Sequence, residues 1–65
     1  MNRRTKSYIM SLAITQTNVW NELLRAIEIA EVNGEDEVAG ELRKVLAPVE
    51  AAANALTRIK KELIK

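Results

Sequence analysis

The chain of 65 residues has no cysteine, no histidine and no phenylalanine, and it contains only one proline and two glycines. Disulfides are therefore excluded, and the usual structural zinc and haem ligand sets are missing. The scarcity of glycine, proline and aromatic residues removes the turn signals and aromatic runs that are typical of β-proteins. These absences favour an all-α protein with no metal and no cofactor.

Long hydrophobic runs are also missing. No apolar run approaches the roughly 18 to 20 residues that a transmembrane helix needs. The short stretch 8–14 is interrupted by Ser11, and polar residues follow it where a signal peptide would have a small-residue cleavage site. We therefore expect a cytoplasmic protein with no membrane partner.

Apolar residues recur at spacings of three and four in both halves of the chain, as on one face of an α-helix. The stripe of the first half is Ile9, Ala13, Gln16, Trp20, Leu23, Ile27 and Ala30, and Leu12, Val19 and Ala26 flank it. The stripe of the second half is Val38, Leu42, Val45, Val49, Ala52, Leu56, Ile59 and Leu63, which has the period of a coiled coil. The pattern predicts one domain, 1–65, with helices over about 5–32 and 36–64 and a turn over about 33–35.

So short a connection forces the two helices to run antiparallel, as a helical hairpin. Pro48 raises an alternative, because a proline inside a helix removes a backbone hydrogen bond and either kinks or splits the helix. The apolar stripe passes through Pro48 without changing phase, and no glycine or polar linker precedes it. One kinked helix is therefore favoured over a third helix that begins at Pro48.

A hairpin of this size is expected to need a partner, because a domain of about 60 residues buries only about 60% of the surface of its unfolded chain. The apolar residues that fall outside the two stripes include Met10, Ile14, Leu24, Ile29, Leu46 and Ile64. Two hairpins packed as a four-helix bundle would cover most of them. We expect a homodimer first and a complex with a different protein second.

The charges are unevenly distributed although the net charge is only +1. A hairpin brings both basic chain ends together, and the candidate phosphate-binding residues there are Arg3, Arg4, Lys6, Arg58, Lys60 and Lys61, with Lys65 beyond them. The acids Glu28, Glu31, Glu35, Asp36, Glu37 and Glu41 gather at the turn. The alternatives are that the cations complement a helix dipole and keep the end soluble, or that the asymmetry guides assembly of two copies.

The outer face of the first helix is polar but largely uncharged, and such a surface is easily desolvated. Its candidate partner-binding residues are Ser7, Tyr8, Met10, Ser11, Ile14, Thr15, Asn18 and Asn21. Gln16 and Trp20 lie within the stripe, where a polar residue fixes register and a large one anchors the core. The alternative is that Gln16 and Trp20 contact a ligand held between helices.

No catalytic constellation is present, since histidine and cysteine are absent and no serine or threonine has an evident base. The acids around the turn lack the spacing of a calcium loop. We therefore expect a non-enzymatic protein-interaction module, a small self-associating regulator, inhibitor or assembly factor. Besides itself, its expected partner is a protein rather than a nucleic acid. An RNA- or DNA-binding hairpin that uses the basic end is the alternative, and a small-ligand binder is a weaker one.

The stripe assignment generates a prediction for two substitutions to aspartate. Leu56→Asp should unfold the chain, because it places a charge in the apolar stripe, whereas Asn18→Asp on the outer face should leave its stability nearly unchanged. Circular dichroism with thermal denaturation compares the two variants. Equal stability of both would show that the stripe is assigned wrongly.

Overall fold

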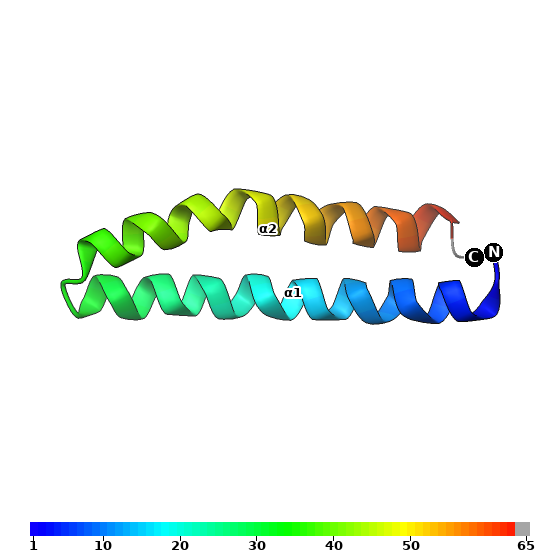
Figure 1. The fold of residues 1–65 in the computed structure, drawn as a ribbon, viewed down its shortest axis with the longest axis horizontal. Coiled ribbons are helices and arrows are strands. Elements are labelled where there is room, and N and C mark those ends of the chain that lie inside the picture. Colours follow the sequence, from blue (N-terminus) through cyan, green and yellow to red (C-terminus); the bar gives the residue numbers. More distant parts are fainter. Residues whose placement is uncertain (64–65) are drawn as a thin grey trace.

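The computed structural model describes residues 1–63, which form two long α-helices joined by a short turn (Figure 1). Helix α1 spans Arg3–Val32 and helix α2 spans Asp36–Leu63. They lie antiparallel as a rod whose Cα atoms extend over 48 × 14 × 13 Å. The start of α1 and the end of α2 share one end of the rod, and the turn forms the other. The predicted all-α helical hairpin is thus confirmed.

Helix α1 begins two residues earlier than the apolar pattern indicates, because Asn2 caps it. The Oδ1 atom of Asn2 accepts a hydrogen bond of 2.8 Å from the backbone N–H of Arg4. Its carbonyl oxygen accepts a second one, of 2.9 Å, from the N–H of Lys6. Asparagine is among the preferred N-cap residues, since its side chain satisfies an N–H group that has no partner within the helix.

The turn reverses the chain within three residues through a glycine in the left-handed conformation. Gly34 has a φ of 73°, and its N–H donates to the carbonyl oxygen of Glu31 at 3.1 Å. The N–H of Glu35 donates to the carbonyl oxygen of Ala30 at 2.8 Å. These two bonds are the Schellman motif, which satisfies the last carbonyl groups of α1. Asp36 and Glu37 then place negative charge at the positive end of the α2 dipole.

The inward face of α1 is the one that the sequence predicts. All seven residues of the predicted stripe are buried or half-buried: Ile9, Ala13, Gln16, Trp20, Leu23, Ile27 and Ala30. The inward face of α2 differs from the prediction. Val38 and Val45 are 47% and 48% exposed, and Leu63 is exposed as well. The residues that face α1 in their place are Ala39, Leu46 and Ala53, together with Leu42, Val49 and Leu56.

The reason for this difference is the size of the side chains. Two apolar rows run along α2 one residue apart, and the spacing alone does not distinguish them. The row that contains Ala39 and Ala53 allows the two helix axes to approach closely, and both alanines are almost fully buried. The prediction that Leu46 lies outside the seam is therefore wrong.

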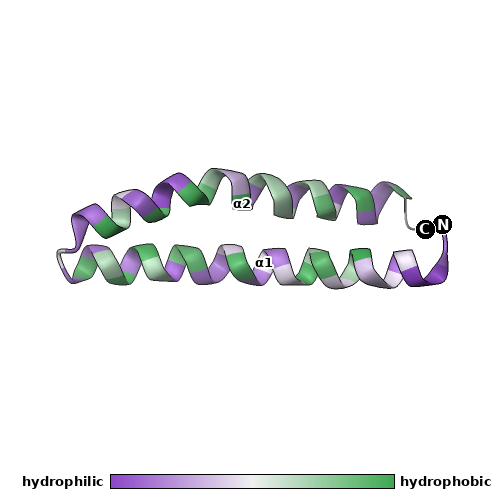
Figure 2. Cartoon of the chain, viewed as in Figure 1, coloured by the Kyte–Doolittle hydropathy of each residue, from purple (hydrophilic) through white to green (hydrophobic). Residues whose placement is uncertain are grey.

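Very little of the hairpin is fully buried. The buried residues of the described chain are Ala13, Ile27, Ala30, Ala39 and Ala53, so only one of them has a large side chain. Figure 2 shows hydrophobic and hydrophilic segments alternating along both helices, as expected for elements with one apolar side. The seam brings the helices together, and most of the large apolar side chains keep contact with solvent.

Pro48 does not split the second helix, because α2 continues through it from Asp36 to Leu63. The helix arches away from α1 in its middle section, which contains Pro48 (Figure 1). Pro48 and Lys44, whose carbonyl group loses its partner, both lie on the exposed side of α2. Water can therefore satisfy that carbonyl, and the alternative of a third helix starting at Pro48 is wrong.

The two glycines should respond in opposite ways to replacement by alanine. Gly34→Ala should lower the free energy of unfolding by about 1–2 kcal/mol, because a Cβ is unfavourable at positive φ. Gly40→Ala is the matched control within α2, where an added Cβ meets no atom within 4 Å. It should raise the free energy of unfolding by roughly 0.5–1 kcal/mol. Urea denaturation at one protein concentration measures both, and shifts of the same sign would contradict the left-handed turn.

Candidate interaction surfaces

One side of the hairpin is apolar along its length. We call its residues the apolar flank: Leu12, Val19 and Ala26 of α1 with Val38, Val45, Ala52 and Ile59 of α2. All but Ile59 precede a seam residue by one position, and Ile59 continues the α2 row seven residues after Ala52. Leu12, Val19, Val38 and Val45 are 42–48% exposed, Ala26 is also exposed, and Ala52 and Ile59 are half-buried. The flank is as apolar as the seam, yet most of it remains exposed in the hairpin.

The two rows of the apolar flank lie on the same side of the rod because the helices are antiparallel. Each helix has one side just before its seam residues in sequence and one side just after them. In an antiparallel pair the two preceding sides adjoin each other. Positions that follow the seam residues adjoin one another on the opposite side. An ion pair of 2.8 Å between Glu31, which follows Ala30, and Arg43, which follows Leu42, demonstrates this arrangement.

The opposite side, which we call the polar flank, carries Thr17, Glu31, Arg43, Glu50 and Thr57. Both side chains of the Glu31–Arg43 pair are about half exposed, so the pair contributes at most about 1 kcal/mol. Leu24 and Met10 also lie on this side and are partly exposed. The hairpin therefore has one apolar flank and one mixed, mainly polar flank. The amino-acid composition, with a net charge of only +1, does not reveal this difference between the two flanks.

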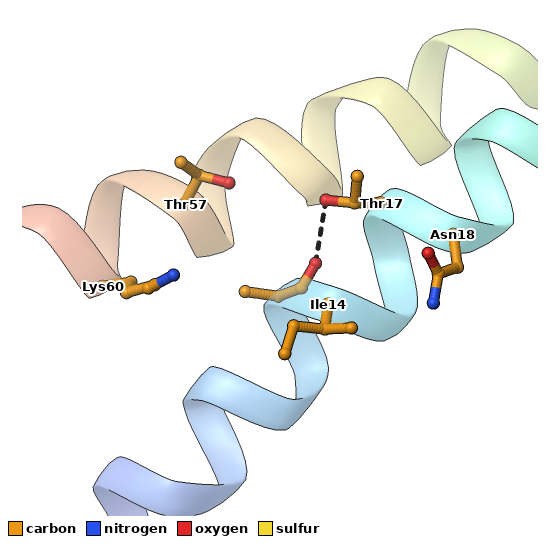
Figure 3. Close-up of a pocket in the computed structure, with 6 residues that line it drawn as sticks. Ile14, Thr17, Asn18, Thr57 and Lys60 are labelled. Carbon is orange, nitrogen blue, oxygen red and sulfur yellow. Dashed lines mark hydrogen bonds between the residues drawn. The ribbon is translucent and has the colours of Figure 1, made fainter.

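A shallow hollow lies on the polar flank between the helices (Figure 3). Its volume is about 190 Å³, below the roughly 300–1,000 Å³ of typical small-ligand sites, and it is open to solvent. Thr17 of α1 and Thr57 and Lys60 of α2 are among its lining residues, and the Thr17 hydroxyl donates to the carbonyl oxygen of Ala13. A second open hollow of about 450 Å³ lies toward the chain ends, and Lys6, Lys60 and Lys61 line it with Met10 and Thr57.

The hairpin brings the predicted cations together at one end of the rod. They are Arg3, Arg4 and Lys6 in the first turns of α1 and Arg58, Lys60 and Lys61 in the last turns of α2. Within residues 1–63 none of these six side chains takes part in an ion pair. Lys65 lies outside the described residues. The basic end is thus an exposed cluster of cations.

The charges of α1 oppose its own dipole at both ends. Its first turn has no acid but contains Arg3 and Arg4, and its last turns have Glu28 and Glu31 and no base in the final turn. A charge that complements a helix terminus stabilises the helix by about 0.3–1 kcal/mol, so charges of the wrong sign are unfavourable by a similar amount. Dipole complementarity explains Lys60 and Lys61 at the end of α2, but it does not explain the cations of α1.

All eight residues predicted to contact a partner are exposed: Ser7, Tyr8, Met10, Ser11, Ile14, Thr15, Asn18 and Asn21. They occupy the side of α1 that faces away from α2, with Met10 at its edge toward the polar flank. Tyr8 and Ile14 are 66% and 60% exposed, which is high for such side chains. The Thr15 hydroxyl donates to the carbonyl oxygen of Ser11 and is thereby partly satisfied within the helix.

Gln16 and Trp20 are half-buried members of the α1 seam. The hollows described above and a third one at the start of α1 are lined by neither residue. Among the described residues no fully buried side-chain polar atom lacks a hydrogen-bond partner, so the half-buried Gln16 does not present an unpaired polar atom to a buried ligand site. These observations favour the structural role of both residues over contact with a ligand.

The remaining site classes have little support in the structure. Residues 1–63 contain no group of three or more acidic, histidine or cysteine side chains arranged to hold a metal ion. Neither described helix has an apolar stretch of the length and hydropathy needed to cross a bilayer. No family model, curated protein or solved structure matches the chain. The surfaces of the hairpin are therefore the basis for a functional conclusion.

Proposed function

We propose that the protein is a non-enzymatic interaction module that associates with itself through the apolar flank and acts by binding another protein, as a small regulator, inhibitor or assembly factor. The observation that carries this proposal is the exposure of Leu12, Val19, Val38 and Val45 along one side of a hairpin whose buried residues are mostly alanines. Apolar side chains at heptad spacing on one side are what the interface of a helical bundle contains.

The surface area of the hairpin supports self-association. A compact monomer of 7.3 kDa would expose roughly 4,200 Å², whereas the hairpin exposes 5062 Å². The excess of about 900 Å² is close to the roughly 800 Å² that each partner buries in a standard interface. An interface of standard size, of which the apolar flank would form the core, would thus give this chain the surface expected of a compact folded protein.

A separate surface remains for the second partner. The outer face of α1, with Tyr8, Ile14 and the uncharged Ser11 and Asn18, points away from α2 and does not belong to the apolar flank. Exposed apolar and aromatic side chains among uncharged polar ones are the composition that protein interfaces favour. Self-association and partner binding would therefore not compete for the same residues.

The self-association proposal predicts a concentration-dependent solution mass. We expect light scattering to give at least a dimer at micromolar concentration, with helicity lost on dilution, because the seam alone buries too little apolar surface. Val19→Glu, on the apolar flank, should lower the mass to that of a monomer, since it would bury an unpaired charge.

The matched control is Val32→Glu in the same helix, at a side chain that is 81% exposed and lies outside the apolar flank. Its solution mass should equal that of the unmodified protein. A monomer that stays helical and cooperatively folded at every concentration would disprove self-association.

A second candidate function is nucleic-acid binding at the basic end, and the observation that favours it is the cluster of six cations without ion pairs in the described chain. Phosphate contacts make binding steeply dependent on salt. We expect any binding to a fluorescent single-stranded RNA to weaken with added salt. Replacing both Lys60 and Lys61 by glutamine should reduce the log–log salt slope by about 1.4.

Lys44→Gln is the control, since Lys44 pairs with Glu41 toward the other end of the rod. Its affinity and salt slope should remain those of the unmodified protein. No measurable binding to RNA or DNA at low salt would eliminate this candidate.

A further inference from the structure

We infer that the apolar flank is covered by a second copy of this chain whose rod points in the opposite direction, so that the basic end of each copy lies against the acidic turn end of the other. This inference rests on the proposed self-association and specifies its geometry. It selects between the two ways in which identical hairpins can pack through one flank with twofold symmetry. Either the turns lie at opposite ends of the complex, or they lie together.

The charges of the two ends decide between these arrangements. The basic end has six cations against Glu62, a formal charge of +5. The acidic end has the six acids from Glu28 to Glu41 against Arg43 and Lys44, a formal charge of −4. With the turns together, each end would meet its own like charge, whereas with the turns apart each end meets the opposite charge. Charges near an interface interact strongly enough to select an orientation.

The dipole of α1 provides an independent argument. Arg3 and Arg4 lie at its positive end, and Glu28 and Glu31 lie near its negative end, so these charges are unfavourable toward the dipole of their own helix. When the turns are apart, twofold symmetry places α1 against α1 of the other copy with reversed direction. The cations of one α1 then lie beside the acids and the negative dipole end of the other. The second copy thus supplies opposite charges beside both ends of α1, which the isolated helix lacks.

The side chains of the flank also fit this geometry. The α1 row of Leu12, Val19 and Ala26 is centred on Val19, which lies near the middle of Arg3–Val32. Reversal about that point puts Val19 opposite its own copy and the large Leu12 opposite the small Ala26 of the other copy. Facing a large residue with a small one is how helices interdigitate without voids. The row is therefore self-complementary when reversed.

Distances between spin labels distinguish the two arrangements, and the absence of cysteine allows single-cysteine labelling. One variant is Val32→Cys, at a side chain that is 81% exposed in the last turn of α1. The second, as the matched control, is Ala51→Cys, an exposed position near the middle of α2. Neither residue belongs to the apolar flank or to the outer face of α1. Both are measured in full-length protein at a concentration where light scattering gives the dimer.

If the turns lie apart with Val19 opposite its own copy, positions 32 of the two copies lie roughly 40 Å apart along the rod, at 1.5 Å per residue, so the labels should be separated by about 40 Å or more. The labels at position 51 should lie within roughly 30 Å of each other, because packed helix axes are about 8–10 Å apart. Added salt should weaken the dimer, since opposite charges attract across the interface. This combination of results supports the inference.

Two other results would overturn it, and they have different meanings. A short distance at both positions, with a dimer that is strengthened by salt, means that the turns lie together, and self-association survives. No dipolar coupling at either position, with a monomeric mass, removes self-association as well. The failure of the geometry is thereby distinguished from the failure of the proposed function.

Discussion

The close approach of two helices through alanines is the constraint on which the rest of this structure depends. Ala13 and Ala30 of α1 and Ala39 and Ala53 of α2 are buried, and Ile27 is the one large residue among the described chain that is equally enclosed. Small side chains allow the backbones to come near each other, but they remove little apolar surface from water. Val38 and Val45 of α2 consequently lie at the side of the seam, and there they form the apolar flank with Leu12 and Val19 of α1.

This placement explains why one side of the hairpin is apolar and exposed. Larger side chains in place of the four buried alanines would separate the two helices. With Ala39 and Ala53 facing α1, Val38 and Val45 remain in contact with solvent. Exposed apolar side chains on one side of the seam and the ion pair between Glu31 and Arg43 on the other give the rod two chemically different flanks.

The sequence predicts the architecture well, and it fails at the step that requires side-chain volume. The helical period, the Asn33–Gly34 turn and the inward residues of α1 follow from local patterns, because period and cap chemistry are local properties. In α2 the row of Val38 and Val45 is more hydrophobic than the row of Ala39 and Ala53, so a pattern read for hydrophobicity selects the wrong one. Which row faces α1 depends on the distance between helices, and that distance is a property of the pair.

The candidate surfaces, too, could be predicted only in part from the sequence. The six cations and the outer residues of α1 could be assigned from the sequence, because a hairpin fixes which ends meet and a helix fixes which side is outward. The apolar flank could not, since its α2 half was indistinguishable from the seam until the alanines were placed. A rotation of α2 by one residue moves the row of Val38 and Val45 from the interior of the hairpin to its surface.

The charges of this molecule differ in sign between the two ends of the rod, and in α1 this placement does not follow the helix dipole. In α2 the acids at the start and the bases at the end agree with the helix dipole, whereas in α1 both are reversed. Within the described hairpin the pair between Glu31 and Arg43 accounts for one of these charges, whereas Arg3 and Arg4 form no ion pair at the positive end of the α1 dipole. The reversal gives each end of the rod a charge of predominantly one sign, and the exposed apolar flank leaves one side of the rod open to solvent. Both features support the proposed association of two copies, which would bring ends of opposite charge together and cover the flank.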